Sequence, residues 1–155
     1  MHLPHLVSFQ KSPIIFLTVC THSRTGLLAD EVSHSTLREI WQQSAVRNGW
    51  YVGRYTLMPD HVHFFAQATL DSCALSDWMR IWKSISAARI NRHLARRGPV
   101  WQPDYFDRYL RSTDDYQQKW EYVLANPVRK GLATTPEQWP FSGVIFELRM
   151  GTRQA

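Results

Sequence analysis

The stretch LMPDHVHFFAQ, residues 57–67, places two histidines one position apart inside an apolar run. Side chains alternate between the two faces of a strand, so His61 and His63 share one face while Val62 and Phe64 share the other. The apolar face suits packing beneath helices. The histidine face suits a surface that is left partly open. A Pro-Asp pair supplies turn chemistry just before the strand, which predicts an antiparallel hairpin with the apolar run that precedes it.

The segments around this stretch alternate between strand-like and helix-like patterns. β-branched and aromatic runs indicate strands, and apolar residues at steps of three and four positions indicate helices. Strands are expected within residues 13–22, 50–58, 61–68 and 100–111, and helices within residues 30–50, 75–98 and 112–127. This order, β-α-β-β-α-β-α, predicts an α+β fold: a ferredoxin-like split βαβ antiparallel sheet with an added C-terminal helix. The helices are expected on one face of the sheet.

Capping residues set the expected ends of the last two helices. Ser76 or Asp77 is expected to cap the second helix, and the Gly-Pro pair at 98–99 to end it. Ser112 is expected to cap the last helix. That helix ends near Asn126, because the proline after it disfavours helical geometry at the preceding residue.

Length and composition limit the class of protein. The chain has 155 residues, 44% hydrophobic and 20% charged, which suits a globular protein. We expect one domain over residues 1–155, with a core at about 13–127 and a C-terminal extension at 128–155. No apolar run approaches the roughly 20 residues that span a bilayer, no export signal is visible, and the two cysteines form no CxxC pair. A cytoplasmic protein without a membrane partner is expected.

The charge and the aromatic content favour nucleic acid as a partner. The formal net charge is +5, and the chain holds seven Trp, seven Phe and six Tyr. Cations bind phosphates, and aromatic rings stack on bases. A solvated basic face around an aromatic core is an equally simple explanation of the same numbers.

The histidine pair is a candidate metal site. His61 and His63 can present two imidazole nitrogens to one ion, although two unrelated surface histidines would show the same spacing. The carbonyl oxygen of Asn126 is a candidate third ligand, and this donor set suits Mg²⁺ or Mn²⁺.

Tyr122 is the candidate nucleophile, because it lies four residues before Asn126 and so on the same side of the last helix. A phenolate that attacks a phosphodiester forms a 5′-phosphotyrosine and releases a 3′-hydroxyl. A half-buried structural tyrosine is the alternative. Tyr116 lines up with Trp120 and Val123 instead, and we expect it in the core.

Basic and aromatic residues near these positions are candidates for DNA binding. Lys119 lies one turn before Tyr122, and the indole of Trp101, like Tyr105 or Phe106, is a candidate for stacking on an unpaired base. The remaining candidates lie along the second helix: Lys83, Arg89, Arg92 and Arg96. A solvated helix face explains this stripe as well.

Five segments of the chain carry a resemblance to a known family. They are MPDHVHFF (58–65), WKSISAARINRHL (82–94), VWQPDYFDRYLR (100–111), YVLANPVRKGL (122–132) and WPFS (139–142). In their order and spacing the chain resembles the single-tyrosine HUH transposases, where HUH stands for histidine, hydrophobic residue, histidine. Within that family it is most similar to the REP-associated tyrosine transposases.

The resemblance implies a ferredoxin-like nuclease domain that acts on single-stranded DNA folded into hairpins. By position, His61 and His63 match the metal-binding histidines, Tyr122 matches the nucleophile, and Asn126 matches the polar residue that completes the metal site. Relatives from insertion sequences commonly have Gln there. The family also implies either a homodimer with the site built in trans or a monomer with the site built in cis, in the cytoplasm of a bacterium and associated with the nucleoid.

Three functions follow as hypotheses. The first is a metal-dependent single-stranded DNA endonuclease and strand-transferase that acts on palindromic repeats. The second is an inactive ferredoxin-like module that binds hairpin DNA or RNA. The third is a phosphodiesterase with water as the nucleophile, in which Tyr122 is structural.

Overall fold

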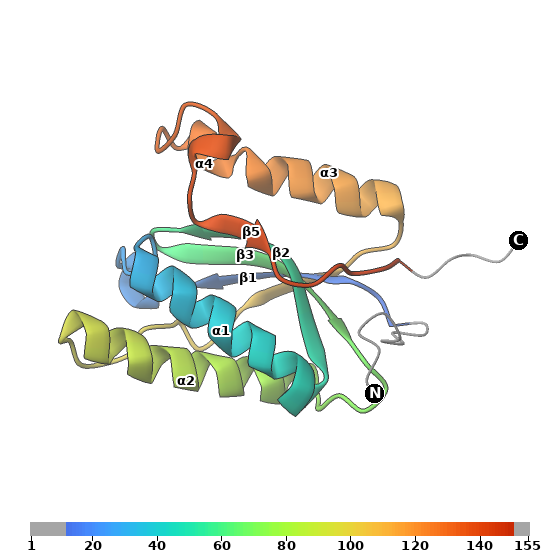
Figure 1. Cartoon of the computed structure of the whole chain (residues 1–155), viewed down its shortest axis with the longest axis horizontal. Coiled ribbons are helices and arrows are strands. Elements are labelled where there is room, and N and C mark those ends of the chain that lie inside the picture. Colours follow the sequence, from blue (N-terminus) through green and yellow to red (C-terminus); the bar gives the residue numbers. More distant parts are fainter. Residues whose placement is uncertain (1–11, 151–155) are drawn as a thin grey trace, which may run out of the picture.

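The histidine-bearing strand lies at the centre of a five-stranded antiparallel sheet. The computed structural model describes residues 12–150, and the strand order in it is β4-β1-β3-β2-β5 (Figure 1). The strands are β1 (Ile15–Cys20), β2 (Trp50–Met58), β3 (His61–Ala68), β4 (Phe106–Tyr109) and β5 (Ser142–Val144). The first four strands make the predicted ferredoxin-like arrangement, so the α+β fold is confirmed.

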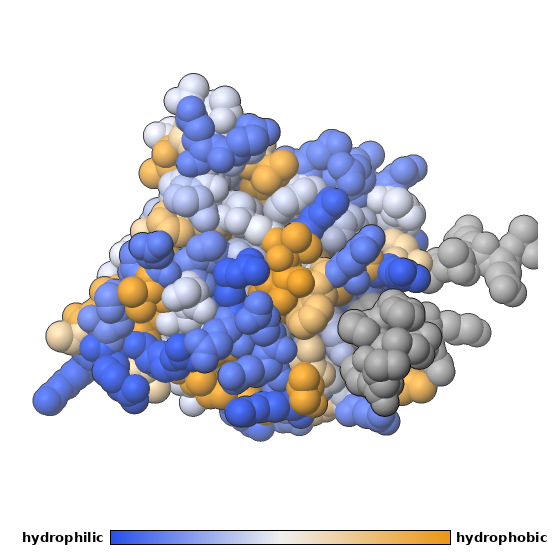
Figure 2. Space-filling model, in the orientation of Figure 1, coloured by the Kyte–Doolittle hydropathy of each residue, from blue (hydrophilic) through white to orange (hydrophobic). Residues whose placement is uncertain are grey.

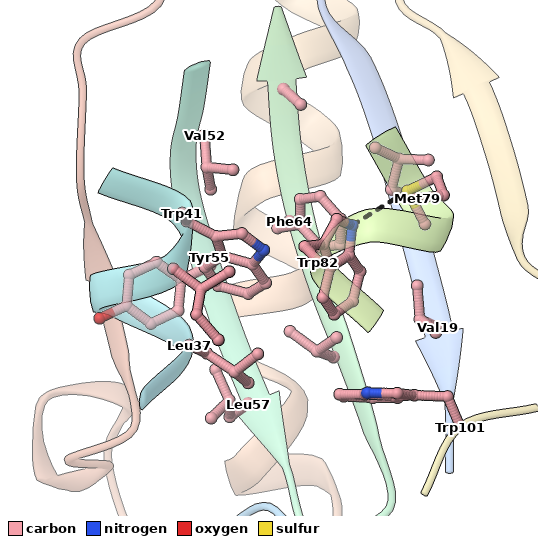
Figure 3. Close-up of a cluster of buried hydrophobic side chains, with 14 of the residues drawn as sticks. Val19, Leu37, Trp41, Val52, Tyr55, Leu57, Phe64, Met79, Trp82 and Trp101 are labelled. Atoms are coloured by element: carbon pink, nitrogen blue, oxygen red, sulfur yellow. Dashed lines mark hydrogen bonds between the residues drawn. The ribbon is translucent and has the colours of Figure 1, made fainter. Parts of the chain in front are cut away.

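Helices α1 (Glu31–Asn48) and α2 (Leu75–Leu94) cover one face of this sheet (Figure 1). Under them lie the apolar side chains of β3, including Val62 and Phe64, which are fully buried. Figure 3 shows the centre of this core, where Trp41 and Trp82 pack on Phe64 with ring centres 4.9 and 5.6 Å away. The alternation along residues 61–68 therefore assigns this face correctly.

Helix α3 (Thr113–Leu124) lies on the opposite face of the sheet, which corrects the expectation that all helices share one face (Figure 1). Its Tyr116 packs on Phe65 with ring centres 4.7 Å apart, and Trp120 meets the same ring. Val123 is fully buried in this second cluster. Helix α3 thus covers the second face in part and ends near the histidines.

The ends of α2 differ from the prediction. Ala74 occupies the N-cap position, so neither Ser76 nor Asp77 caps the helix. The helix ends at Leu94, where Ala95 adopts a left-handed backbone with φ of 51°, before the Gly-Pro pair is reached. The expected cap of α3 is present, since the Ser112 side chain accepts a hydrogen bond from the N–H of Asp115.

After α3 the chain continues with α4 (Asn126–Arg129), a short 3-10 turn (Pro136–Gln138) and β5, which the sequence did not predict as a strand. β5 pairs with β2 and approaches it closely: a side chain at Gly143 would lie 2.7 Å from the Tyr55 hydroxyl. Hydrophobic side chains gather over β5 and the chain after it (Figure 2). Within residues 12–150, no helix has the length and apolar character needed to cross a membrane.

Candidate active site

One pocket gathers the candidate metal ligands and the candidate nucleophile. His61 and His63 come from β3, Tyr122 from α3 and Asn126 from α4, and all four side chains line the same pocket. The rings of the two histidines have centres 4.7 Å apart. The pocket opens on the face of the sheet that carries α3, beside the C-terminal end of that helix.

His61 is held by the carboxylate of Asp60, the residue that also forms the turn before β3. Its Nδ1 lies 2.8 Å from Oδ1 of Asp60, and the other oxygen of Asp60 accepts a hydrogen bond from Nε of Arg24 at 2.9 Å. Burial acts to raise the pKa of Asp60, but the hydrogen bonds from Arg24 and His61 outweigh it and lower that pKa. The ionised carboxylate accepts the Nδ1 proton and so directs Nε2 of His61 into the pocket.

Arg24 reaches Asp60 from a strained turn. Ser23 and Arg24 have φ of 55° and 53°, which is left-handed backbone and costs roughly 1–2 kcal/mol per non-glycine residue. The guanidinium also donates to Sγ of Cys20 at 3.3 Å. Strain of this kind concentrates at functional sites. Here the strained turn directs the Arg24 guanidinium toward the Asp60 carboxylate that holds His61.

His63 is fixed by a strand neighbour. Its Nδ1 lies 2.8 Å from Oγ1 of Thr18, and its ring stacks on Phe16 with centres 5.5 Å apart. Burial lowers the pKa of His63 to about 3, and His61 and nearby cations add to the effect. Burial also lowers the pKa of His61 against the opposing influence of Asp60. Both imidazoles are therefore neutral at pH 7, which is the form that ligates metals.

The Asn126 amide lies against the histidine pair and is buried. Its Nδ2 is 3.4 Å from Nε2 of His61, and its Oδ1 accepts a hydrogen bond from Arg129 at 3.3 Å. The helix that carries it starts with the Asn-Pro pair, because proline fits the first turn of a helix and breaks the one before.

These residues fit a divalent metal ion. Two neutral imidazoles face the pocket, and rotating the Asn126 amide brings its oxygen to the position beside Nε2 of His61. Among residues 12–150, no three histidine, cysteine or carboxylate side chains are placed to hold an ion. The Asn126 amide also lines this pocket and carries an oxygen donor of the kind that suits Mg²⁺ or Mn²⁺.

Tyr122 is exposed and lies between cations. Its side chain is 60% exposed, unlike Tyr116 on the same helix. The Arg129 guanidinium carbon lies 3.9 Å from the ring centre, and Nζ of Lys119 lies 5.9 Å from it. Lys130 also lines the pocket. The phenol is thus accessible to a bulky substrate, and the cations around it favour an anionic one.

Helix α2, which carries Lys83, Arg89 and Arg92 of the basic stripe, lies on the other face of the sheet from α3 (Figure 1), whereas residues of β3, α3 and α4 line the pocket. Nζ of Lys83 donates to the carbonyl of Gln102 at 2.7 Å, and burial lowers the pKa of Lys83. Arg89 pairs with Glu39 at 3.0 Å. Arg96 donates to Asn91 at 2.7 Å, and Arg92 is exposed on this helix. Lys119 is the one of the predicted basic residues that the structure brings to the pocket region.

Trp101 is not available for stacking on a base, which corrects that prediction. It is 6% exposed, its ring packs on Trp82 at 5.3 Å, and its N–H donates to Oγ of Ser86. Phe106 on β4 is 56% exposed and meets Phe16, whose ring stacks on His63. Phe106 therefore offers an exposed ring near His63.

Sequence reasoning missed several residues that line this pocket or contact the side chains that do. Asp60 directly precedes His61, and that adjacency was the available signal. Arg129 and Lys130 follow Asn126 in the same motif, ANPVRKGL, at the spacing of one helical turn. Arg24 had no local signal, since a strained turn brings it to the site from 36 residues away in sequence.

Comparisons with known proteins agree with the fold and with the family resemblance. The family model "Transposase IS200 like" matches residues 11–123, a range that includes both histidines and Tyr122. The chain is 27% identical over 92 residues to the REP-associated tyrosine transposase of Escherichia coli K12, covering 59% of this chain and 52% of the relative. The chain thus spans about half the length of that relative.

Two further similarities come from a second organism and from a solved structure. The ISDra2 transposase TnpA of Deinococcus radiodurans is 32% identical over 92 residues, 56% of this chain and 64% of the relative. The structure of a REP-associated tyrosine transposase bound to a REP hairpin aligns with a TM-score of 0.70 and 21% identity, covering 96% of each chain. At that identity, the structural match establishes a common fold.

Proposed function

This chain belongs to the IS200-like transposase family, and we propose that it cleaves and rejoins single-stranded DNA through a covalent bond to Tyr122. The observation that carries the proposal is the pocket itself. An exposed phenol, two neutral histidines and a buried amide from three different elements line one cavity. A tyrosine with only a structural role would be expected to be buried, whereas Tyr122 is exposed beside two oriented histidines.

The proposed step exchanges one phosphodiester for another. Oη of Tyr122 loses its proton and forms a bond to phosphorus, while the bond from phosphorus to the 3′-oxygen breaks and that oxygen takes up a proton. The products are a 5′-phosphotyrosine and a free 3′-hydroxyl. Attack by a 3′-hydroxyl on the phosphotyrosine reverses the step and joins the strands.

His61, His63 and Asn126 would hold the metal ion, Mg²⁺ or Mn²⁺. Such an ion polarises a phosphate and neutralises charge on the departing oxygen. Both imidazoles suit metal binding because they are neutral and because Asp60 and Thr18 fix their orientation.

The proposed substrate is DNA that folds into hairpins at palindromic repeats. Support comes from the resemblance to the solved transposase that is bound to a REP hairpin. Around the pocket, Arg24, Lys119, Arg129 and Lys130 form a positive rim that suits a strand of phosphates. The exposed ring of Phe106 lies on the same face of the sheet and suits an unpaired base.

We further propose a monomer with the site in cis. In the structure, β3, α3 and α4 of one chain supply the candidate metal ligands and the candidate nucleophile to one pocket. A site built in trans would place α3 away from the histidines of its own chain. A DNA substrate also places the protein at the bacterial nucleoid, in the cytoplasm.

The first experiment tests for the covalent product. An oligonucleotide that contains a host palindrome is labelled at its 3′ end, because the 3′ part of the strand is the part that stays bonded to Tyr122. It is incubated with the protein and Mn²⁺ or Mg²⁺, then separated on a denaturing protein gel. We expect a labelled band at protein size with the wild type and with Tyr109→Phe, an exposed tyrosine outside the pocket. Tyr122→Phe and EDTA should both abolish it.

The other outcomes select the alternatives. Cleavage without a covalent band would replace the proposal with the water-using phosphodiesterase. Binding without cleavage, over several palindromes and both metals, would favour the inactive hairpin-binding module.

A further inference from the structure

Arg129 contacts both the nucleophile and the third metal-ligand candidate. Its guanidinium carbon lies 3.9 Å from the centre of the Tyr122 ring. The same guanidinium donates a hydrogen bond to Oδ1 of Asn126 at 3.3 Å. Tyr122, Asn126 and Arg129 follow one another at steps of four and three residues across the junction of α3 and α4, which lines them up on one side.

The hydrogen bonds around Asn126 define which way its amide faces. Asp60 accepts the Nδ1 proton of His61, so Nε2 of His61 is an acceptor, and Nδ2 of Asn126 is the donor opposite it. The amide oxygen therefore faces away from the histidines and toward Arg129. In this arrangement Arg129 holds the oxygen that a metal ion would need.

We propose that Arg129 couples metal loading to the nucleophile by competing with the metal for the Asn126 oxygen. This inference rests on the proposed function. When the amide turns its oxygen to the ion, its NH₂ group faces Arg129, and two donors cannot bond to each other. The guanidinium then loses its acceptor and donates instead to a non-bridging oxygen of the phosphate that Tyr122 attacks.

The coupling has a consequence for ordering. Without metal, Arg129 is occupied by Asn126 and lies over the Tyr122 ring. With metal, the same side chain supplies two hydrogen-bond donors beside the phenol. Arg129 would thus assist cleavage when the site holds a metal ion. In the metal-free site, its hydrogen bond to Asn126 would oppose metal binding.

The test measures two quantities that move in opposite directions. Arg129→Gln should bind Mn²⁺ about fivefold more tightly in calorimetry on the DNA-free protein, since the competitor for Asn126 is weakened. The same variant should form the covalent DNA adduct about 100-fold more slowly at saturating Mn²⁺, since a donor to the phosphate is lost. Arg129→Lys keeps the charge without the forked geometry and should recover part of the rate.

Two controls separate this coupling from loss of charge or of folding. Lys130→Gln removes a cation from the same pocket, and it should tighten Mn²⁺ binding less than Arg129→Gln does. In an Asn126→Ala background, Arg129→Gln should add no more than Lys130→Gln does, because the shared oxygen is gone.

The results have separate meanings. Unchanged or weaker Mn²⁺ binding by Arg129→Gln would overturn the coupling while leaving the tyrosine mechanism intact. Equal gains in Arg129→Gln and Lys130→Gln would reduce the effect to charge and also overturn it. Absence of an adduct in the wild type would instead overturn the proposed function.

Discussion

The role of His61 depends on Asp60, which contacts its ring, and on Arg24, which contacts Asp60. A lone imidazole on a strand can turn and can carry its proton on either nitrogen. Here Asp60 holds Nδ1 at 2.8 Å, and Arg24 holds Asp60 at 2.9 Å, so Nε2 is left to face the pocket. Carboxylates in this position orient a ligating histidine and raise its basicity.

We therefore expect Asp60→Asn to weaken metal binding. The amide is similar in size but carries no charge, so it supports Nδ1 of His61 less well. The affinity for Mn²⁺ should fall by about 10- to 100-fold in calorimetry on the DNA-free protein. Asp71→Asn, at an exposed carboxylate away from the pocket, is the matched control and should match the wild type. Equal affinities in the two variants would show that Asp60 only forms the turn.

Strand β4 shows how alternation divides one element between two faces. Phe106 pairs with Thr18 and so lies on the histidine face, whereas Tyr109 pairs with Ile15 on the α1 and α2 face. Both rings are similarly exposed, at 56% and 54%. Phe106 and Tyr109 therefore differ mainly in the face of the sheet on which their side chains lie, and less in the chemistry of their rings.

This difference makes a paired prediction for DNA binding. In a Tyr122→Phe background, Phe106→Ala should weaken binding of a hairpin with an unpaired tail by roughly 1–3 kcal/mol, the range for loss of one stacked base. Tyr109→Ala should bind as tightly as its parent. Fluorescence anisotropy over a series of salt concentrations measures both. A loss of equal size in the two variants would remove the stacking role of Phe106.

The chain as a whole is tied together by polar contacts between layers. The Tyr55 hydroxyl on β2 meets Nε2 of His34 at 2.6 Å and accepts from Arg38, both on α1. The His34 ring also meets Phe141, just before β5, with centres 5.8 Å apart. This network links the helical layer, the sheet and the C-terminal extension.

The stability of the fold should consequently fall in mild acid. Burial and the Arg38 charge lower the pKa of His34 below its ordinary value. Above about pH 6.5, the ordinary histidine pKa, His34 is neutral in both folded and unfolded chains. As the pH falls below that value, the unfolded chain binds the proton first, so the free energy of unfolding decreases until the folded pKa is passed.

Urea unfolding at pH 7.5 and 5.5, in EDTA, tests this contribution. His34→Gln cannot titrate, so its loss of stability between the two pH values should be smaller than that of the wild type. His61 and His63 titrate in both proteins and cancel in the comparison. An identical loss in the two proteins would mean that His34 has no part in the acid sensitivity.

Local patterns in the sequence predicted a large part of this protein. The alternation in residues 57–67 separated the core face from the histidine face, and the order of strands and helices predicted the ferredoxin-like sheet. The position of Tyr122 four residues before Asn126 predicted that the two lie together, and they line one pocket although α3 ends between them and Asn126 starts α4. Each of these inferences uses a period of two or 3.6 residues, which a sequence displays.

Features that depend on distant contacts were not readable in this way. Trp101 is buried because it packs on Trp82 and donates to Ser86, and nothing around it in the sequence distinguishes it from an exposed ring. β5 forms where the tail meets an open edge of β2. Arg24 reaches Asp60, and α3 takes the opposite face of the sheet, through packing between segments far apart in the chain. The periodicity of a sequence indicates which side of a helix or strand is apolar. Which segment packs against that side depends on contacts between residues far apart in the chain.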